Sequence, residues 1–118
     1  MMDDEQVVRD VACELARALG HEVDFAENGE AAVNKYRVAA ESGNPFDIVI
    51  LDLVVRGGLG GKETLARLRA IDSGIKAIIS SGYADSNAVA DYKTNGFAGR
   101  LVKPYKLGDL NEALNALL

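Results

Sequence analysis

The hydrophobic positions along this chain follow two different periods. Apolar residues at helical spacing predict helices at residues 7–19, 30–42, 62–71 and 107–117, with a weaker helix near 87–94. Short alternating or continuous apolar runs predict strands at residues 21–26, 48–51, 76–80 and 98–102. The first helix should end at Gly20, because glycine accepts the left-handed backbone conformation found at many helix ends.

This order of elements predicts one α/β domain. The run IVIL, between Asp47 and Asp52, is apolar at every position, as expected for a strand covered on both faces of a parallel sheet. Alternating strands and helices with short connections place helices on both faces of such a sheet, with right-handed crossovers. A chain of 118 residues can bury a stable core without disulfide bonds or a structural metal. We therefore expect a single domain over residues 1–118.

Composition and charge narrow the class of protein. Hydrophobic residues make up 48% of the chain and charged residues 26%, which is typical of a folded globular protein. The net charge of -5 argues against direct nucleic-acid binding, which needs clustered Lys and Arg. The single cysteine, Cys13, lies in a helical pattern and is expected to be a buried structural thiol. Without an apolar run of membrane-span length, we expect a cytoplasmic domain that does not contact the membrane.

Polar residues stand where several of the predicted strands end. Asp52, Ser81 and Lys103 each follow a strand, and Asp3 and Asp4 precede the first helix. Ligands of open parallel sheets bind beyond the carboxyl ends of the strands, so these groups should converge. Neighbouring carboxylates repel each other unless a cation lies among them, and hard oxygen ligands favour Mg²⁺. The pattern predicts a divalent metal at this edge of the sheet.

Each group taken alone has a plainer explanation. The two N-terminal aspartates could cap the first helix, Ser81 could be a turn residue, and Lys103-Pro104 could be a surface turn. The glycines at 57, 58, 60 and 61 lack the order of a phosphate-binding loop. The functional interpretation depends on the joint order of the groups: an acidic pair, a strand-end aspartate, a strand-end Ser-Gly and a strand-end Lys-Pro.

Four stretches of the chain resemble the receiver domain of two-component response regulators: MDDE at 2–5, ILDL at 50–53, ISSGYAD at 79–85 and GRLVKPY at 99–105. The resemblance runs over essentially all of the sequence. It implies a flavodoxin-like, doubly wound parallel sheet of five strands in the order 2-1-3-4-5, with helices on both faces. The motifs SSGYAD and LVKPY, with the glycine-rich loop, are most similar to those of receivers attached to hybrid sensor histidine kinases. This resemblance would make the chain one domain of a longer protein in a phosphorelay.

The resemblance also assigns roles to residues. Asp52 would take a phosphoryl group from the histidine of a kinase or a phosphotransfer domain, and the domain would then change conformation to signal. Ser81 would bond to the phosphoryl group and Lys103 would pair with it. Such a domain is not a conventional enzyme, but it assists its own phosphorylation and dephosphorylation. The implied Mg²⁺ ligands are Asp3 through water, Asp4 directly, Asp52, and the backbone carbonyl of Val54.

The chain also departs from the receiver pattern. Only Met1 and Met2 precede the acidic pair, so the first strand is nearly missing, and a clipped start is the preferred explanation. Its loss should expose unpaired neighbours and a hydrophobic slot, which invites destabilisation, pairing with another chain or swapping. A weak homodimer is among the expected partners. The usual Met-Pro after the acceptor strand reads Val55-Arg56, which puts a cation near the site. Arg100 stands where many receivers place an aromatic switch residue.

Two alternative functions remain open. A pseudo-receiver would act as an interaction module without phosphorylation. The short first strand and Arg100 favour it, while the intact set of Asp4, Asp52, Ser81 and Lys103 opposes it. A metal-dependent phosphohydrolase also uses a strand-end aspartate, but it usually has a second acid two residues later, where Val54 stands.

Overall fold

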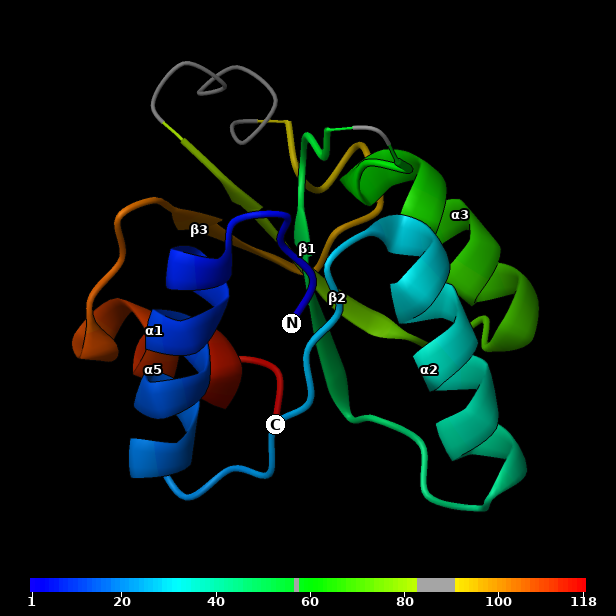
Figure 1. The fold of residues 1–118 in the computed structure, drawn as a ribbon, viewed down its shortest axis with the longest axis horizontal. Helices are drawn as coiled ribbons and strands as arrows, with labels where there is room; N and C mark the ends of the chain where they lie inside the picture. The colour runs from blue at the N-terminus through cyan, green and yellow to red at the C-terminus, as the bar shows by residue number, and fades with distance from the viewer. Residues whose placement is uncertain (57, 83–90) are drawn as a thin grey trace.

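The computed structural model describes residues 1–56, 58–82 and 91–118. Its helices and strands alternate along most of the chain (Figure 1). In chain order the elements are α1 (Gln6–Ala18), α2 (Gly29–Glu41), β1 (Ile48–Asp52), α3 (Gly61–Ile71), β2 (Lys76–Ser81), β3 (Gly99–Val102) and α5 (Leu107–Asn115).

The three strands form a parallel sheet in the order β1-β2-β3. Ile50 of β1 lies opposite Ile78 of β2, and Asp52 lies opposite Ser80. On the other side of β1, Met2 forms isolated parallel bridges with both Leu51 and Ala26. The segments therefore follow the order Ala26, Met2, β1, β2, β3, which is the expected 2-1-3-4-5 arrangement.

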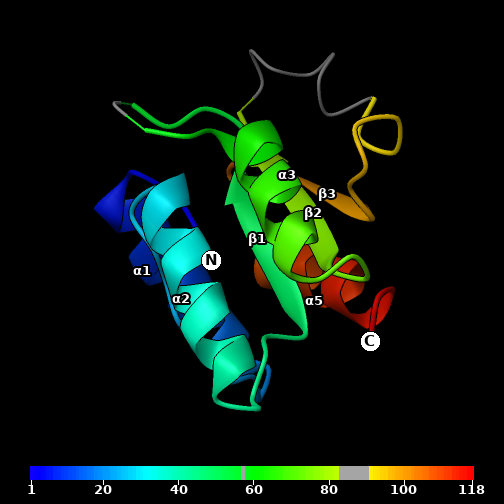
Figure 2. The same ribbon diagram turned by 90° about the vertical axis from the view of Figure 1, so that its right-hand side faces the viewer.

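Helices cover both faces of the sheet, with α1 and α5 on one face and α2 and α3 on the other (Figures 1 and 2). Successive side chains of a strand point to opposite faces, so each buried strand supplies two cores. Ile50 and Ile78 pack with α1 and α5, while Leu51 and Ile79 pack with α2 and α3. The doubly wound parallel α/β class is confirmed, and it explains why IVIL is apolar throughout.

The prediction of a strand at residues 21–26 is wrong. The described residues form a sheet of three strands, where five were expected. Residue 26 forms an isolated bridge with Met2, through Ala26 N–H to the Met1 carbonyl at 2.8 Å and Asp3 N–H to the Ala26 carbonyl at 3.1 Å. The Met1 ammonium also donates to the Asp24 carbonyl at 3.1 Å. A strand needs a continuous neighbour for its backbone groups, and here the neighbour consists of residues 1–3 only. Isolated bridges at Met2 therefore stand where two further strands were expected.

Most helix predictions are confirmed within one or two residues. The first helix is followed by Gly20 at φ +89°, the left-handed conformation expected there. The last helix ends at Asn115, two residues before the predicted end. Residues 87–90 of the weaker helix expected near 87–94 lie outside the described residues, and residues 91–96 form turns. Cys13 is buried in α1, as expected.

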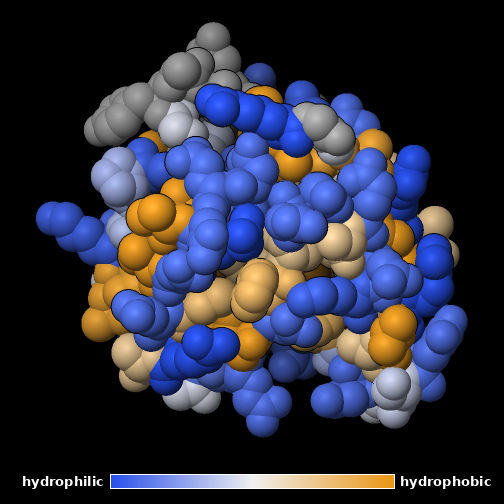
Figure 3. All heavy atoms as spheres, in the orientation of Figure 1, coloured by the Kyte–Doolittle hydropathy of each residue, from blue (hydrophilic) through white to orange (hydrophobic). Residues whose placement is uncertain are grey.

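A groove of about 640 Å³ lies beside Met1, lined by residues of α1, the segment that follows it and the start of β1. Polar side chains cover most of the face in Figure 3, and apolar residues show near its middle. No described helix has the length and apolar character needed to cross a membrane.

Candidate functional site

Asp52 is the last residue of β1, and its side chain is only 7% exposed. The chain after it turns back so that the start of α3 packs on the backbone of Asp52 and Leu53. A Cβ at Gly61 would lie 2.8 Å from the Asp52 carbonyl oxygen, and the Gly61 N–H donates to the Leu53 carbonyl at 3.1 Å. The glycine-rich loop therefore serves close backbone packing at the site, which explains why glycines follow a buried acid.

Ser81 and Lys103 are brought to the same edge by the pairing of β2 with β3. Ser81 lies opposite Val102, and the Lys103 N–H donates to the Ser81 carbonyl at 2.7 Å, one residue beyond the strand. The Lys103-Pro104 peptide bond is cis. The predicted convergence of the three strand ends is present in the structure.

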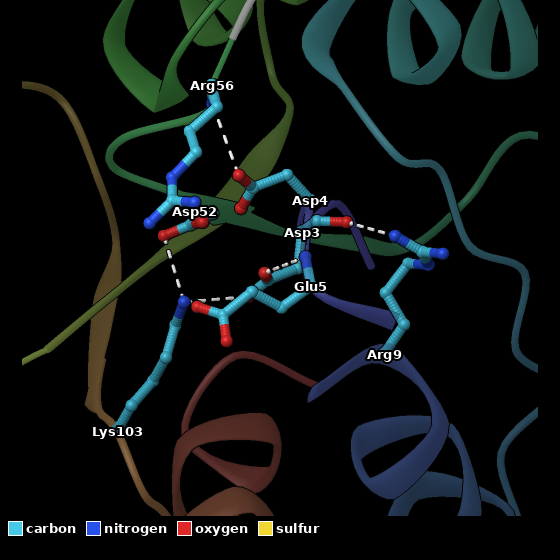
Figure 4. A network of polar contacts seen from close by, with 7 residues as sticks. All are labelled: Asp3, Asp4, Glu5, Arg9, Asp52, Arg56 and Lys103. Atoms are coloured by element: carbon cyan, nitrogen blue, oxygen red, sulfur yellow. Dashed lines mark hydrogen bonds and ion pairs between the residues drawn. The ribbon is translucent and has the colours of Figure 1, made fainter. Parts of the chain in front are cut away.

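The Lys103 ammonium is shared between two buried carboxylates. Its Nζ lies 2.7 Å from Asp3 Oδ2 and 3.1 Å from Asp52 Oδ1 (Figure 4). The Asp3 side chain is completely buried and that of Lys103 is 16% exposed, so solvent screens these pairs weakly. The carboxylates raise the pKa of Lys103 above its usual value, against the effect of burial. The single positive charge of Lys103 thus compensates the negative charges of Asp3 and Asp52 at a site that water reaches poorly.

Asp52 has a strongly perturbed pKa. Burial and the nearby charge of Asp3 raise it from 3.8 to about 6, although Lys103 acts in the opposite direction. Asp4 adds a smaller repulsion. Such a shift is common at functional sites, where the surroundings disfavour a charge that a ligand or reaction later compensates.

Two buried serines end β2, the strand that pairs with β1, and Ser80 lies opposite Asp52. Neither Ser80 Oγ nor Ser81 Oγ has a hydrogen-bond partner among the described residues. Ser81 is 1% exposed, so its hydroxyl is withdrawn from bulk water. A buried hydroxyl without a partner costs free energy, and a hydrogen bond to an added oxygen atom would recover it.

The acidic segment before α1 forms the third part of the site. The carboxylate oxygens of Asp3, Asp4 and Glu5 lie within 4.8 Å of one another. Asp4 Oδ2 accepts a hydrogen bond from the Arg56 N–H at 3.2 Å, and Asp3 Oδ1 accepts one from the Glu5 N–H at 3.0 Å (Figure 4). Because both Asp3 oxygens are engaged, Asp4 has the freer carboxylate. An all-oxygen set of this kind fits Mg²⁺.

Two predicted metal ligands, Asp52 and Val54, are not part of the cluster formed by Asp3, Asp4 and Glu5. Asp52 connects with it through Lys103, as the two ion pairs show, and Val54 has a 60% exposed side chain in the loop after β1. Its backbone carbonyl makes no hydrogen bond among the described residues. Asp52 and Val54, like Asp3 and Asp4, therefore remain predictions as metal ligands.

Comparison with known proteins supplies the family. The sequence model of the response regulator receiver domain matches residues 1–115. The chain belongs to this family. It is 34% identical over 113 residues to two-component response regulator ORR41 of Oryza sativa subsp. japonica, which covers 92% of this chain and 86% of that protein. It is a receiver domain, and its function is that of a phosphoacceptor in two-component signalling.

Two further relatives are similar over nearly their whole length. Sporulation initiation phosphotransferase F of Bacillus subtilis (strain 168) is 26% identical over 118 residues, covering 100% of this chain and 90% of that protein. The solved structure of response regulator protein TrrA from Thermotoga maritima, in complex with Mg²⁺ and BeF, has a TM-score of 0.81 and 30% identity. That match covers 99% of this chain and 95% of that one.

Two side-chain contacts of this receiver domain could not be predicted from the sequence. Arg9 of α1 donates from Nη1 to the Asp3 carbonyl at 2.8 Å and so ties the acidic segment to the helix. The Arg100 guanidinium is exposed on β3 and lies 5.6 Å from the centre of the Tyr92 ring. Helical spacing places Arg9 one turn after Glu5, but nothing in the pattern says which oxygen it contacts.

Proposed function

We propose that Asp52 is the residue of this receiver domain that accepts the phosphoryl group. The observation that carries the proposal is its place: a buried carboxylate at the carboxyl end of the central strand, 3.1 Å from the Lys103 ammonium. The pKa of about 6 means that the carboxylate is mostly ionised near neutral pH, as a nucleophile must be.

The transfer itself needs little from the protein beyond position and charge. A carboxylate oxygen of Asp52 forms a bond to phosphorus while the bond between phosphorus and the donor's imidazole nitrogen breaks. The electron pair of that bond stays with the imidazole, and the product is an acyl phosphate. Lys103 compensates the charge of the phosphoryl oxygens, and the Ser81 hydroxyl donates a hydrogen bond to one of them.

The residues proposed to hold Mg²⁺ are Asp4 directly, Asp3 through water, Asp52, and the carbonyl of Val54. The engagement of both Asp3 oxygens by Lys103 and Glu5 supports an indirect role for Asp3. When bound, Mg²⁺ would neutralise charge on the phosphoryl oxygens.

The donor would be a histidine kinase or a phosphotransfer domain, and a weak homodimer is a further proposal. Direct contact with nucleic acid or membrane is not expected from the net charge of -5 and the sequence. Cytoplasmic location, one domain over residues 1–118 and attachment to a hybrid histidine kinase stay predictions from the sequence.

Intact mass after incubation with Mg²⁺ and acetyl phosphate tests the proposal. We expect a gain of one phosphoryl group that hydroxylamine removes, since acyl phosphates react with it, and no gain in Asp52→Asn. A folded wild-type sample without any gain would refute the acceptor role and favour a pseudo-receiver. A gain that survives in Asp52→Asn would place the acceptor elsewhere.

A further inference from the structure

Arg56 lies at the rim of the acceptor site with its backbone fixed. It follows β1 by four residues, and its N–H donates to Asp4 Oδ2 at 3.2 Å. Its side chain is exposed, and in Figure 4 it extends from the loop toward the side of the site where Asp52 lies. In that view the Asp52 carboxylate lies between the Arg56 guanidinium and the Lys103 ammonium.

The guanidinium is available for a ligand. Among the residues that the structure describes, the ion pairs are Lys35 with Asp24 and Lys103 with Asp3 and Asp52, and none engages Arg56. The one hydrogen bond that the described residues give Arg56 uses its backbone N–H. The hydrogen bond to Asp4 therefore holds Arg56 beside the acidic cluster, with a guanidinium that has no partner among the described residues.

The charge balance of the site gives this cation a use. Asp3, Asp4, Glu5 and Asp52 bring four carboxylates to one edge of the sheet, and the buried Lys103 is already shared by two of them. An anionic phosphodonor that approaches from solvent meets this negative field before it reaches Lys103. The planar guanidinium group presents paired N–H donors that match two phosphoryl oxygens at once.

We propose that Arg56 is a second cation of the acceptor site, which pairs with the phosphoryl oxygens of the donor and of the product on Asp52. The inference rests on the proposed function of Asp52. It assigns no bond-making step to Arg56: the phosphorus changes partner from the donor to Asp52, and Arg56 only contacts the transferred oxygens. The same positive charge opposes the approach of Mg²⁺, so Arg56 favours the anion at the expense of the metal.

Beryllofluoride, a mimic of the phosphoryl group, separates these effects without turnover. Calorimetry would measure beryllofluoride affinity at saturating Mg²⁺, and Mg²⁺ affinity alone, in the wild type, Arg56→Gln, Arg56→Lys and Arg67→Gln. The last variant removes an exposed charge from α3 that takes part in none of the site's hydrogen bonds or ion pairs. Thermal unfolding shows that each variant is folded.

We expect Arg56→Gln to weaken beryllofluoride binding by about three- to tenfold and to tighten Mg²⁺ binding by a few-fold, as loss of one partly screened cation predicts. Arg56→Lys should fall between it and the wild type, because it keeps the charge but loses the paired donors. Equal beryllofluoride affinity in Arg56→Gln and Arg67→Gln would overturn the role of Arg56 alone. A folded wild type that binds no beryllofluoride would overturn the acceptor proposal as well.

Discussion

Replacing Asp52 by asparagine should stabilise the metal-free receiver domain, and the gain should grow with pH. The folded protein holds the Asp52 proton up to about pH 6, whereas the ordinary pKa of the group is 3.8. Between these values the folded state binds more protons than the unfolded state, so wild-type stability falls as pH rises through that window. Asparagine carries no proton that titrates there, and its stability lacks this loss.

The size of the effect follows from the same two values. A rise from 3.8 to about 6 corresponds to about 3 kcal/mol, because one pKa unit is worth about 1.36 kcal/mol. The side chain is 7% exposed, so little of this is lost to solvent screening. Near pH 4 the wild-type carboxyl is neutral and resembles asparagine, so the difference should be small there. Above pH 7 it should reach its full value.

Urea unfolding in EDTA, followed by circular dichroism between pH 4 and 8, measures this difference. The chain has no tryptophan, so fluorescence is a poorer probe. Glu14→Gln removes an exposed carboxylate from α1 and controls for net charge. A difference between wild type and Asp52→Asn that stays constant or shrinks as pH rises would refute the reasoning. It would mean that Lys103 compensates Asp52 more completely than the shared geometry indicates.

Three other perturbations test the site and its packing by thermal and urea unfolding. Mg²⁺ at ten times its dissociation constant should stabilise the wild type by about 1.4 kcal/mol and the Asp52→Asn variant less; equal gains would exclude Asp52 as a ligand. Lys103→Met should cost about 3–5 kcal/mol because buried Asp3 loses its cation, and adding Asp3→Asn should recover most of this. Gly29→Ala should cost about 2 kcal/mol or more, since its Cβ would lie 2.8 Å from the Leu59 carbonyl oxygen. Gly108→Ala, with nothing within 4 Å, should instead stabilise α5, and similar losses in both variants would contradict the packing argument.

The main features of the fold and site could be predicted because they depend on local pattern. The apolar run before Asp52 fixes a strand covered on both faces, and the carboxyl end of that strand must lie at the ligand-binding edge. Ser81 and Lys103 follow equally clear strands, so their convergence needed only the parallel topology. These positions are set by the backbone and do not depend on how a side chain rotates.

What could not be predicted depends on partners distant in sequence. Residues 21–26 alternate like a strand, but strand formation requires a neighbour, and three N-terminal residues provide one bridge instead of a ladder. The hydrogen bonds of Arg9 to Asp3 and of Arg56 to Asp4 depend on loop geometry and side-chain rotamers. Neither leaves a periodic trace in the sequence.

The site combines a charge imbalance with a rigid connection to the sheet edge. Lys103 Nζ lies between Asp3 and Asp52, while its backbone N–H is held by Ser81 at the end of β2. A phosphoryl group on Asp52 would convert a carboxylate whose charge burial disfavours into an acyl phosphate with new acceptor oxygens. Lys103 could approach them, and so could the Ser81 hydroxyl, which has no partner among the described residues. A backbone shift that follows Lys103 toward those oxygens would act on β3, where the exposed Arg100 lies over Tyr92. The contact between Arg100 and Tyr92 is therefore one place on the described surface at which to look for a change that begins at Asp52.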